Sequence, residues 1–209
     1  MSEFDEMAMS WDDDPSRVER AAIIADFLKS KIDLNHIKSA LEYGSGTGLL
    51  SFELKDEIDR ITLMDASANM TEVARIKIET TGAVNLKAIK GDLLIDEYPT
   101  LKVELIYTLL TLHHVIDVKK LLVKFNDHLT PEGYLVIIDL ETEDGSFHDG
   151  EFHGHKGFSR STLEGLINDA GLAFVSYDIC YTINKISEEG VDKNYPVFML
   201  VAKKTYSHE

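Results

Sequence analysis

Basic residues and cysteine are scarce in this chain of 209 residues. It has 21 Lys and Arg against 37 Asp and Glu, which gives a formal net charge of -16. Such a surface repels phosphate backbones and anionic lipid within about 8 Å in physiological salt, so we expect neither nucleic acid nor a membrane as partner. The single cysteine, Cys180, excludes an internal disulfide framework.

The sequence also lacks a long apolar run and a leader-like beginning. The opening residues MSEFDEMAMSWDDD have neither a basic region nor an apolar one. No apolar stretch approaches the roughly 18 residues of a membrane-spanning helix. We therefore expect a soluble cytoplasmic protein, with a length that suits one domain with a sizeable core.

Segments of strand character alternate with helical segments along most of the chain. This alternation predicts an α/β fold, a Rossmann-like three-layer sandwich around a mostly parallel sheet. The last two strand-like segments are separated by the polar residues 184–194, which have no helical period, so we expect a seven-stranded sheet with an antiparallel final strand. The expected strands are 39–43, 61–64, 86–89, 104–108, 134–138, 173–183 and 197–203, and the expected helices between them are 49–54, 69–79, 118–128 and 161–170.

An acidic arm precedes the first helix. Asp14 followed by Pro15 is typical of a helix start, and apolar residues then recur at helical spacing. We divide the chain into an N-terminal arm and helix, residues 1–30, and a main domain, residues 31–209. Trp11, the only tryptophan, lies in the arm. We expect the arm to dock through this side chain at the edge of a ligand cleft and to act as a lid. The alternative is that it packs on the outer face of the sheet or first helix.

Three glycines, Gly44, Gly46 and Gly48, alternate between the first strand and the following helix. Glycines at such a turn permit positive φ and let backbone N–H groups approach a ligand. The dinucleotide fingerprint would need its third glycine at the position of Leu49, so the spacing departs from that of nicotinamide-binding proteins.

Acidic residues follow the next two strands. Ligands of open α/β sheets collect at the carboxyl ends of strands. Asp65 there can accept hydrogen bonds from both hydroxyls of a ribose, and Asp92 can accept one from an adenine amine, with Leu93 as an apolar edge to the ring.

With these residues, the sequence resembles the class I S-adenosylmethionine-dependent methyltransferases. The glycine motif is Glu42-Tyr-Gly-Ser-Gly-Thr-Gly here, and the resemblance implies that Glu42 orients the amino group of S-adenosylmethionine. It also implies that Asp65 binds the ribose, Asp92 the adenine, and Met70 the adenosine. S-Adenosylhomocysteine is the implied product. The expected cofactor-binding residues are Glu42, Gly44, Ser45, Gly46, Gly48, Asp65, Ala66, Met70, Asp92, Leu93, Thr108 and Trp11.

Histidines supply the candidate catalytic residues. His113 and His114 follow the fourth strand, where an imidazole can act as a base, or where they simply bond to backbone at a helix start. His153 and His155, with His148, lie in the long loop after the fifth strand. We expect a substrate-facing or solvated loop and no metal site, because no acid or cysteine is fixed beside these histidines by spacing. The acids Asp139, Glu141, Glu143 and Asp144 are interpreted as a solvated turn.

The acceptor is predicted to be a small molecule, methylated on oxygen, carbon or nitrogen. The segment after the fourth strand lacks the Asn/Asp-Pro-Pro-aromatic loop typical of base and amide methylation in the family, and Cys180 is expected far from the cleft. Two alternatives stay open: an NAD(P)-dependent oxidoreductase, or a non-catalytic cofactor-binding or interaction protein. The chain is also a candidate homodimer.

Overall fold

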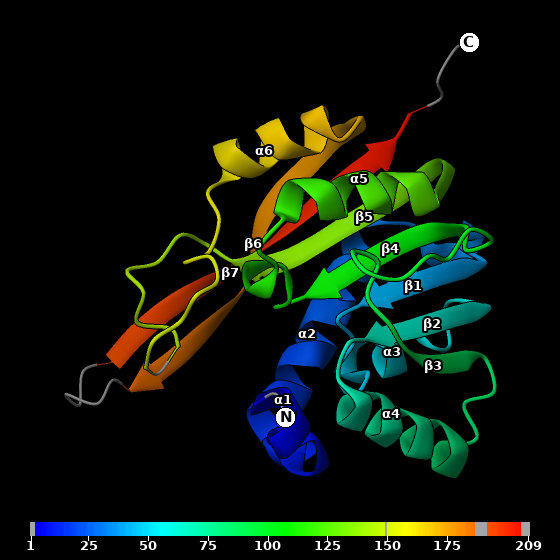
Figure 1. Ribbon diagram of the computed structural model, residues 1–209, viewed down its shortest axis with the longest axis horizontal. Coiled ribbons are helices and arrows are strands. Elements are labelled where there is room, and N and C mark those ends of the chain that lie inside the picture. Colours follow the sequence, from blue (N-terminus) through cyan, green and yellow to red (C-terminus); the bar gives the residue numbers. More distant parts are fainter. Residues whose placement is uncertain (1–2, 149, 187–191, 206–209) are drawn as a thin grey trace.

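A seven-stranded sheet forms the centre of the computed structural model, which describes residues 3–148, 150–186 and 192–205. The strand order is β3-β2-β1-β4-β5-β7-β6 (Figure 1). Neighbouring strands pair in parallel except for β7, which is antiparallel to both β5 and β6. The predicted fold class is therefore confirmed. The strands are β1 Ser39–Tyr43, β2 Arg60–Asp65, β3 Leu86–Lys90, β4 Val103–Leu109, β5 Leu129–Leu140, β6 Leu172–Ile186 and β7 Asp192–Lys204.

Helices cover both faces of this sheet and complete three layers. One core cluster joins α2 and α3 to one face through buried residues such as Leu28 and Leu54, and the other joins α5 and α6 to the opposite face through Phe125 and Leu163. The α-helices are α1 Glu3–Met7, α2 Pro15–Lys31, α3 Leu49–Leu54, α4 Ala68–Thr81, α5 Val118–His128 and α6 Arg160–Asp169, and the 3-10 helices are η1 Ala8–Asp13, η2 Leu34–His36 and η3 Leu112–His114.

Local signals explain where the helices begin. The Asp14 carboxylate accepts a hydrogen bond from the backbone N–H of Ser16 at 2.9 Å, and Pro15 occupies the first position of α2, as expected for a capped helix start. Ser67 caps α4 in the same way by accepting from the N–H of Met70 at 3.1 Å. None of the helices that the structure describes is long and apolar enough to cross a membrane.

The last two strands extend beyond their predicted bounds. Most of the polar segment 184–194, predicted as a connection, continues the β6–β7 ladder, with Lys185 paired to Lys193. Residues 187–191, where we expected a hairpin-like connection, lie outside the described residues. The far ends of β6 and β7 project beyond the helices, and the loop 141–159 runs beside them (Figure 1).

Glu132 adopts φ +65°, a left-handed conformation that usually favours glycine. Glu132 lies within β5, and its carboxylate accepts from Lys203, which ties this part of β5 to β7.

Candidate functional site

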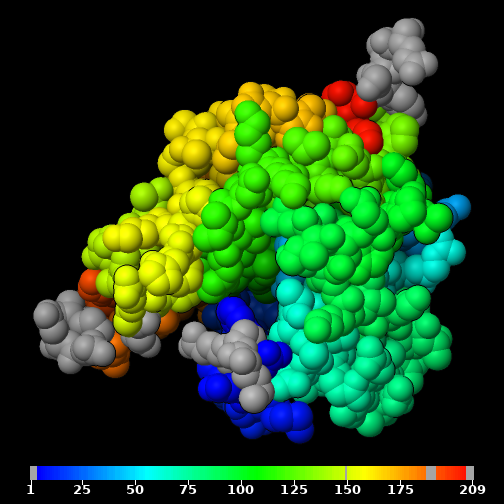
Figure 2. Space-filling view, viewed as in Figure 1, coloured from blue at the N-terminus to red at the C-terminus, as the bar shows by residue number. Residues whose placement is uncertain are grey.

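A cavity of about 940 Å³ opens at the carboxyl ends of β1, β2 and β4. The N-terminal arm, the turn after β1, η3 and the loop 141–159 surround it. Figure 2 shows the arm, in blue, and this loop, in yellow-green to yellow, on opposite sides of the hollow. The cavity is therefore located where ligands of open α/β sheets bind.

The three glycines of the turn after β1 are needed for different reasons. A Cβ on Gly44 would lie 2.1 Å from Cγ2 of Thr111, and one on Gly48 would lie 2.3 Å from Leu63 Cδ2. A Cβ on Gly46 meets no protein atom closer than Met70 Sδ at 3.9 Å, although Gly46 also has a positive φ of +52°. The turn therefore leaves open space in front of Gly46, which is a cradle that a side chain would fill.

Glu42 lies at the end of β1 and is 2 % exposed. Its carboxylate accepts a hydrogen bond from the Ser51 hydroxyl, which lies 2.6 Å from the hydroxyl of Tyr107. Burial raises the pKa of Glu42 to about 8, against the lowering effect of the bond from Ser51. The approach of a cation would therefore stabilise the ionised form of this carboxyl group.

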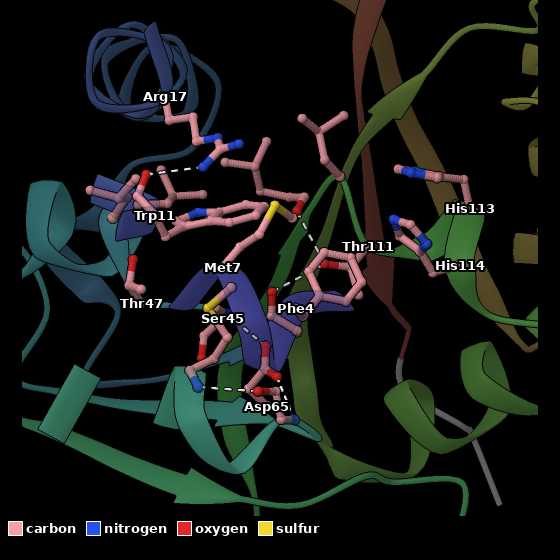
Figure 3. Close-up of a pocket in the computed structure, with 18 of the residues that line it drawn as sticks. Phe4, Met7, Trp11, Arg17, Ser45, Thr47, Asp65, Thr111, His113 and His114 are labelled. Carbon is pink, nitrogen blue, oxygen red and sulfur yellow. Dashed lines mark hydrogen bonds between the residues drawn. The ribbon is translucent and has the colours of Figure 1, made fainter. Parts of the chain in front are cut away.

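Asp65 ends β2 and is held by two backbone groups. Its Oδ2 accepts from the N–H of Gly46 at 2.7 Å, and its Oδ1 accepts from the N–H of Ser67 at 2.8 Å (Figure 3). Burial raises the pKa of Asp65, and these two bonds oppose that effect. The carboxylate is fixed between the glycine turn and the start of α4, with a lone pair on each oxygen still available.

Asp92 follows β3 and faces the same cavity. Its Oδ1 accepts from the Tyr43 hydroxyl at 2.6 Å and from the N–H of Leu94 at 2.8 Å. Among the hydrogen bonds of the described residues, none engages Oδ2, so that oxygen is available to an amino group.

Nine of the twelve predicted cofactor-binding residues line the cavity, and three do not. Leu93 is buried in the core cluster under α5, and Thr108 is fully buried within β4. Gly48 packs against Leu63. The nine are Glu42, Gly44, Ser45, Gly46, Asp65, Ala66, Met70, Asp92 and Trp11.

The arm is helical and lies on the predicted cofactor side of the cavity. Asp5 accepts from the Ser67 hydroxyl at 2.5 Å, and Asp12 accepts from Thr47 at 2.5 Å and from Lys77 at 2.7 Å.

Three of the apolar side chains of the arm point inward, whereas Met9 is exposed. Phe4, Met7 and Trp11 extend toward the cavity between Asp65 and the histidines of η3 (Figure 3). The guanidinium of Arg17 lies 3.8 Å from the centroid of the Trp11 ring. Trp11 therefore lines the cleft and also packs on the first helix through Arg17, so it combines the two positions considered for it.

A buried histidine and carboxylate define the opposite side of the cavity. Nδ1 of His113 lies 2.5 Å from Oδ1 of Asp139, and the two side chains are 1 % and 0 % exposed. Nε2 of His113 is buried and has no hydrogen-bond partner among the residues that the structure describes. The interpretation of Asp139 as part of a solvated turn was wrong, because β5 continues to Leu140 and turns this side chain toward η3.

His114 and His148 lie beside His113, with ring centroids 4.1 and 5.1 Å from that of His113. Burial, together with His113 and His148, lowers the pKa of His114 to about 3, so its imidazole is neutral at physiological pH. His153 is exposed, and Nε2 of His155 donates a hydrogen bond to the carbonyl of Val115 at 3.0 Å. Neither of them lines the cavity, in contrast to His113 and His114.

The residues that the sequence did not indicate come from distant segments. Phe4, Thr111, Phe147 and Phe152 all line the cavity. An aromatic residue in an arm or loop carries no local signal of the strand end that it will face. The histidine content of the loop 141–159 was the one available hint, and it pointed to His148.

The sequence matches the methyltransferase domain family over residues 16–177, which is most of the chain. The chain belongs to this methyltransferase family. Its members' fold implies S-adenosylmethionine as cofactor, and the cradle at Gly46 together with the acids Glu42, Asp65 and Asp92 fits that molecule. No curated protein matches the sequence.

Solved structures share this fold at low identity. A protein named as a methyltransferase, from the complex with the Haloferax volcanii Trm112 methyltransferase activator, has a TM-score of 0.79 and 17% identity over 99% of each chain. An S-adenosylmethionine-dependent methyltransferase from Clostridium acetobutylicum has a TM-score of 0.67 and 19% identity, and the match covers 87% of this chain and 91% of that one. The [4+2]-cyclase SpnF has a TM-score of 0.72 and 13% identity, and the match covers 89% of this chain and 81% of that one.

Proposed function

We propose that this protein transfers the methyl group of S-adenosylmethionine to a small-molecule acceptor bound on the histidine side of the cavity. One observation carries the proposal. Three carboxyl groups, from Glu42, Asp65 and Asp92, stand at three successive strand ends around one cavity whose turn leaves open space at Gly46.

Each acid has a partner in the cofactor. Glu42 would accept from the ammonium group, whose charge compensates the burial of the carboxylate. Asp65 would accept from the ribose hydroxyls with its remaining lone pairs, and Oδ2 of Asp92 from the adenine amine. When bound, S-adenosylmethionine supplies an electrophilic methyl group on a sulfonium sulfur.

The acceptor then lies between the cofactor and the rings of His113 and His114. These residues orient its nucleophilic atom, and the arm and the loop 141–159 exclude water from the reacting centre. The enclosure by Phe4, Trp11 and Phe152 favours a small acceptor over a polymer, because a polymer needs an open groove.

Calorimetry tests the cofactor half of the proposal. We expect S-adenosylhomocysteine and S-adenosylmethionine to bind with one site per chain, and no binding of either at millimolar concentration would overturn the proposal. A panel of hydroxyl, amine and carbon acceptors with isotope-labelled methyl then tests transfer. Binding of NADH, followed by its fluorescence, would instead favour the oxidoreductase.

A second candidate is a protein that binds the cofactor and does not transfer its methyl group. The [4+2]-cyclase with the same fold is a reason to keep it, because that protein's name describes a reaction other than methylation. Tight binding of S-adenosylmethionine without transfer to any acceptor in the panel would favour this candidate.

A further inference from the structure

Three histidines from two distant segments meet at the acceptor side of the cavity. His113 and His114 belong to η3, and His148 belongs to the loop after β5. Each offers a ring nitrogen, and these nitrogens lie within 4.8 Å of one another. We refer to these three residues as the histidine cluster. Three imidazoles converging on one point are the ligand set of many zinc sites that keep a fourth position open.

One member of the cluster is oriented by a buried carboxylate. Nδ1 of His113 lies 2.5 Å from Oδ1 of Asp139, whose Oδ2 also accepts from the backbone N–H of His113 at 3.2 Å. Because the carboxylate accepts from Nδ1–H, the lone pair of the ring is on Nε2. That atom is buried and lacks a hydrogen-bond partner within residues 3–148, 150–186 and 192–205, which is costly for a polar group unless something else binds it. Carboxylate–histidine pairs of this kind orient metal ligands and raise their basicity.

The loop that carries His148 is held against the cavity by contacts on both sides. Before His148, the carbonyl of Phe147 accepts from Lys185 Nζ at 2.6 Å. Beyond it, the N–H of His155 donates to the carbonyl of His113 at 2.7 Å, and a side chain at Gly154 would collide with the same carbonyl. The ring of His148 stacks on Phe152 with centroids 3.7 Å apart. The cluster is therefore prearranged.

We propose that the histidine cluster binds one divalent transition-metal ion of the zinc type, through Nε2 of His113 and one ring nitrogen each of His114 and His148. Nitrogens that share one zinc at about 2.1 Å lie about 3.4 Å apart, so modest ring rotations close the site. Imidazole ligands select zinc, cobalt or nickel over magnesium. The metal faces the cavity and leaves a position open.

The open position gives the metal a role in methyl transfer, and this part rests on the proposed function. A hydroxyl bound there becomes more acidic and loses its proton to solvent, and its oxygen then bonds to the methyl carbon while the carbon–sulfur bond of the sulfonium breaks and S-adenosylhomocysteine leaves. Metal binding itself does not depend on the cofactor, so the two hypotheses are tested separately.

Titration of the untagged, chelator-treated protein with Zn²⁺ alone is the first experiment, and the visible absorption of bound Co²⁺ reports a tetrahedral site. We expect one ion per chain. His148→Ala and His114→Ala should weaken binding by at least about 100-fold, because each removes one of three ligands. His153→Ala is the matched control, since it changes an exposed histidine of the same loop outside the cavity. It should bind Zn²⁺ like the parent.

Asp139→Asn tests the orienting carboxylate. It should weaken Zn²⁺ binding by about 10–100-fold, the usual effect of losing such a partner. Thermal melts and titration with S-adenosylhomocysteine show whether each variant is folded. Absence of Zn²⁺ and Co²⁺ binding by the parent, or equal weakening by His148→Ala and His153→Ala, would overturn the metal site and leave the cofactor titration unaffected.

Discussion

The two sides of the cavity are built in different ways. The side with Glu42, Asp65 and Asp92 consists of strand ends and a glycine turn, and its groups are fixed by backbone geometry. The side with His113, Asp139 and His148 joins η3, the end of β5 and a long loop, which meet only in the folded chain. The first arrangement suits a constant ligand, and the second can vary with the acceptor while the sheet stays the same.

Gly46→Val should have the largest effect on ligand binding, and it should act only on the side of the cavity that holds Glu42, Asp65 and Asp92. The new side chain enters the open space of the cradle, so we expect loss of S-adenosylhomocysteine binding by calorimetry. Gly82→Val is the control, because Gly82 has a similar φ of +67° at the end of α4 with nothing within 4 Å of a Cβ. It carries the same backbone strain, about 1–2 kcal/mol, without touching the cavity. Equal binding by the Gly46 variant and the parent would place the cofactor elsewhere.

Asp65→Ala should weaken S-adenosylhomocysteine binding by about 1.5–3 kcal/mol, the usual range for hydrogen bonds to a charged acceptor. Asp59→Ala, which removes an exposed carboxylate outside the cavity, should leave the dissociation constant unchanged. If the folded Asp65 variant binds as the parent does, this carboxylate does not hold the ribose.

Cofactor affinity should fall with decreasing pH because of Glu42. Its pKa in the free protein is raised to about 8, and the ammonium of the cofactor binds the ionised form. Binding below pH 8 therefore requires proton release, and affinity should fall roughly fivefold from pH 8 to pH 7. Calorimetry in buffers of different ionisation enthalpy measures the released proton. In Glu42→Gln, binding should be weaker and independent of pH in this range; an unchanged slope would assign the effect to another group.

In the protein without ligand, Glu42 should also make the stability depend on pH, but stability should fall with rising pH whereas cofactor affinity rises. Because the folded pKa of Glu42 lies above its ordinary value of 4.5, its contribution to the free energy of unfolding declines as pH rises from about 4.5 to 8. Urea unfolding of Glu42→Gln should lack that decline.

Ligand binding should have its smallest effect on the arm, which should become more ordered without a change in the rest of the fold. If it is a lid, S-adenosylhomocysteine should shift the emission of Trp11 and slow proteolysis near Met7 and Met9. Asp12→Asn weakens the contacts to Thr47 and Lys77 and should make the free arm easier to cleave. Unchanged emission and cleavage at saturating ligand would leave the arm as a static wall.

The sequence predicted the strand-end side better than the opposite side for a physical reason. Glu42, Asp65 and Asp92 were located because parallel strands bring their carboxyl ends to one edge. Leu93 and Thr108 do not line the cavity because the backbone there turns these neighbours of the site into the core. Asp139 was wrong because the predicted strand ended at residue 138, and the two further residues put its side chain inside the protein. The meeting of His148 with His113 depends on tertiary packing of the loop, which no local pattern encodes.

Thr111 occupies the space that a side chain at Gly44 would need, and its hydroxyl donates to the carbonyl of Gly44 at 3.1 Å. A Cβ at Gly44 would lie only 2.8 Å from the Cβ of Thr111, so even alanine at both positions would collide. The two residues are thus an epistatic pair, 67 positions apart in the chain. During divergence, the turn that faces the cavity can gain a side chain at position 44 without a collision only where position 111 has already become glycine. This order of events restricts how the two sides of the cavity can evolve.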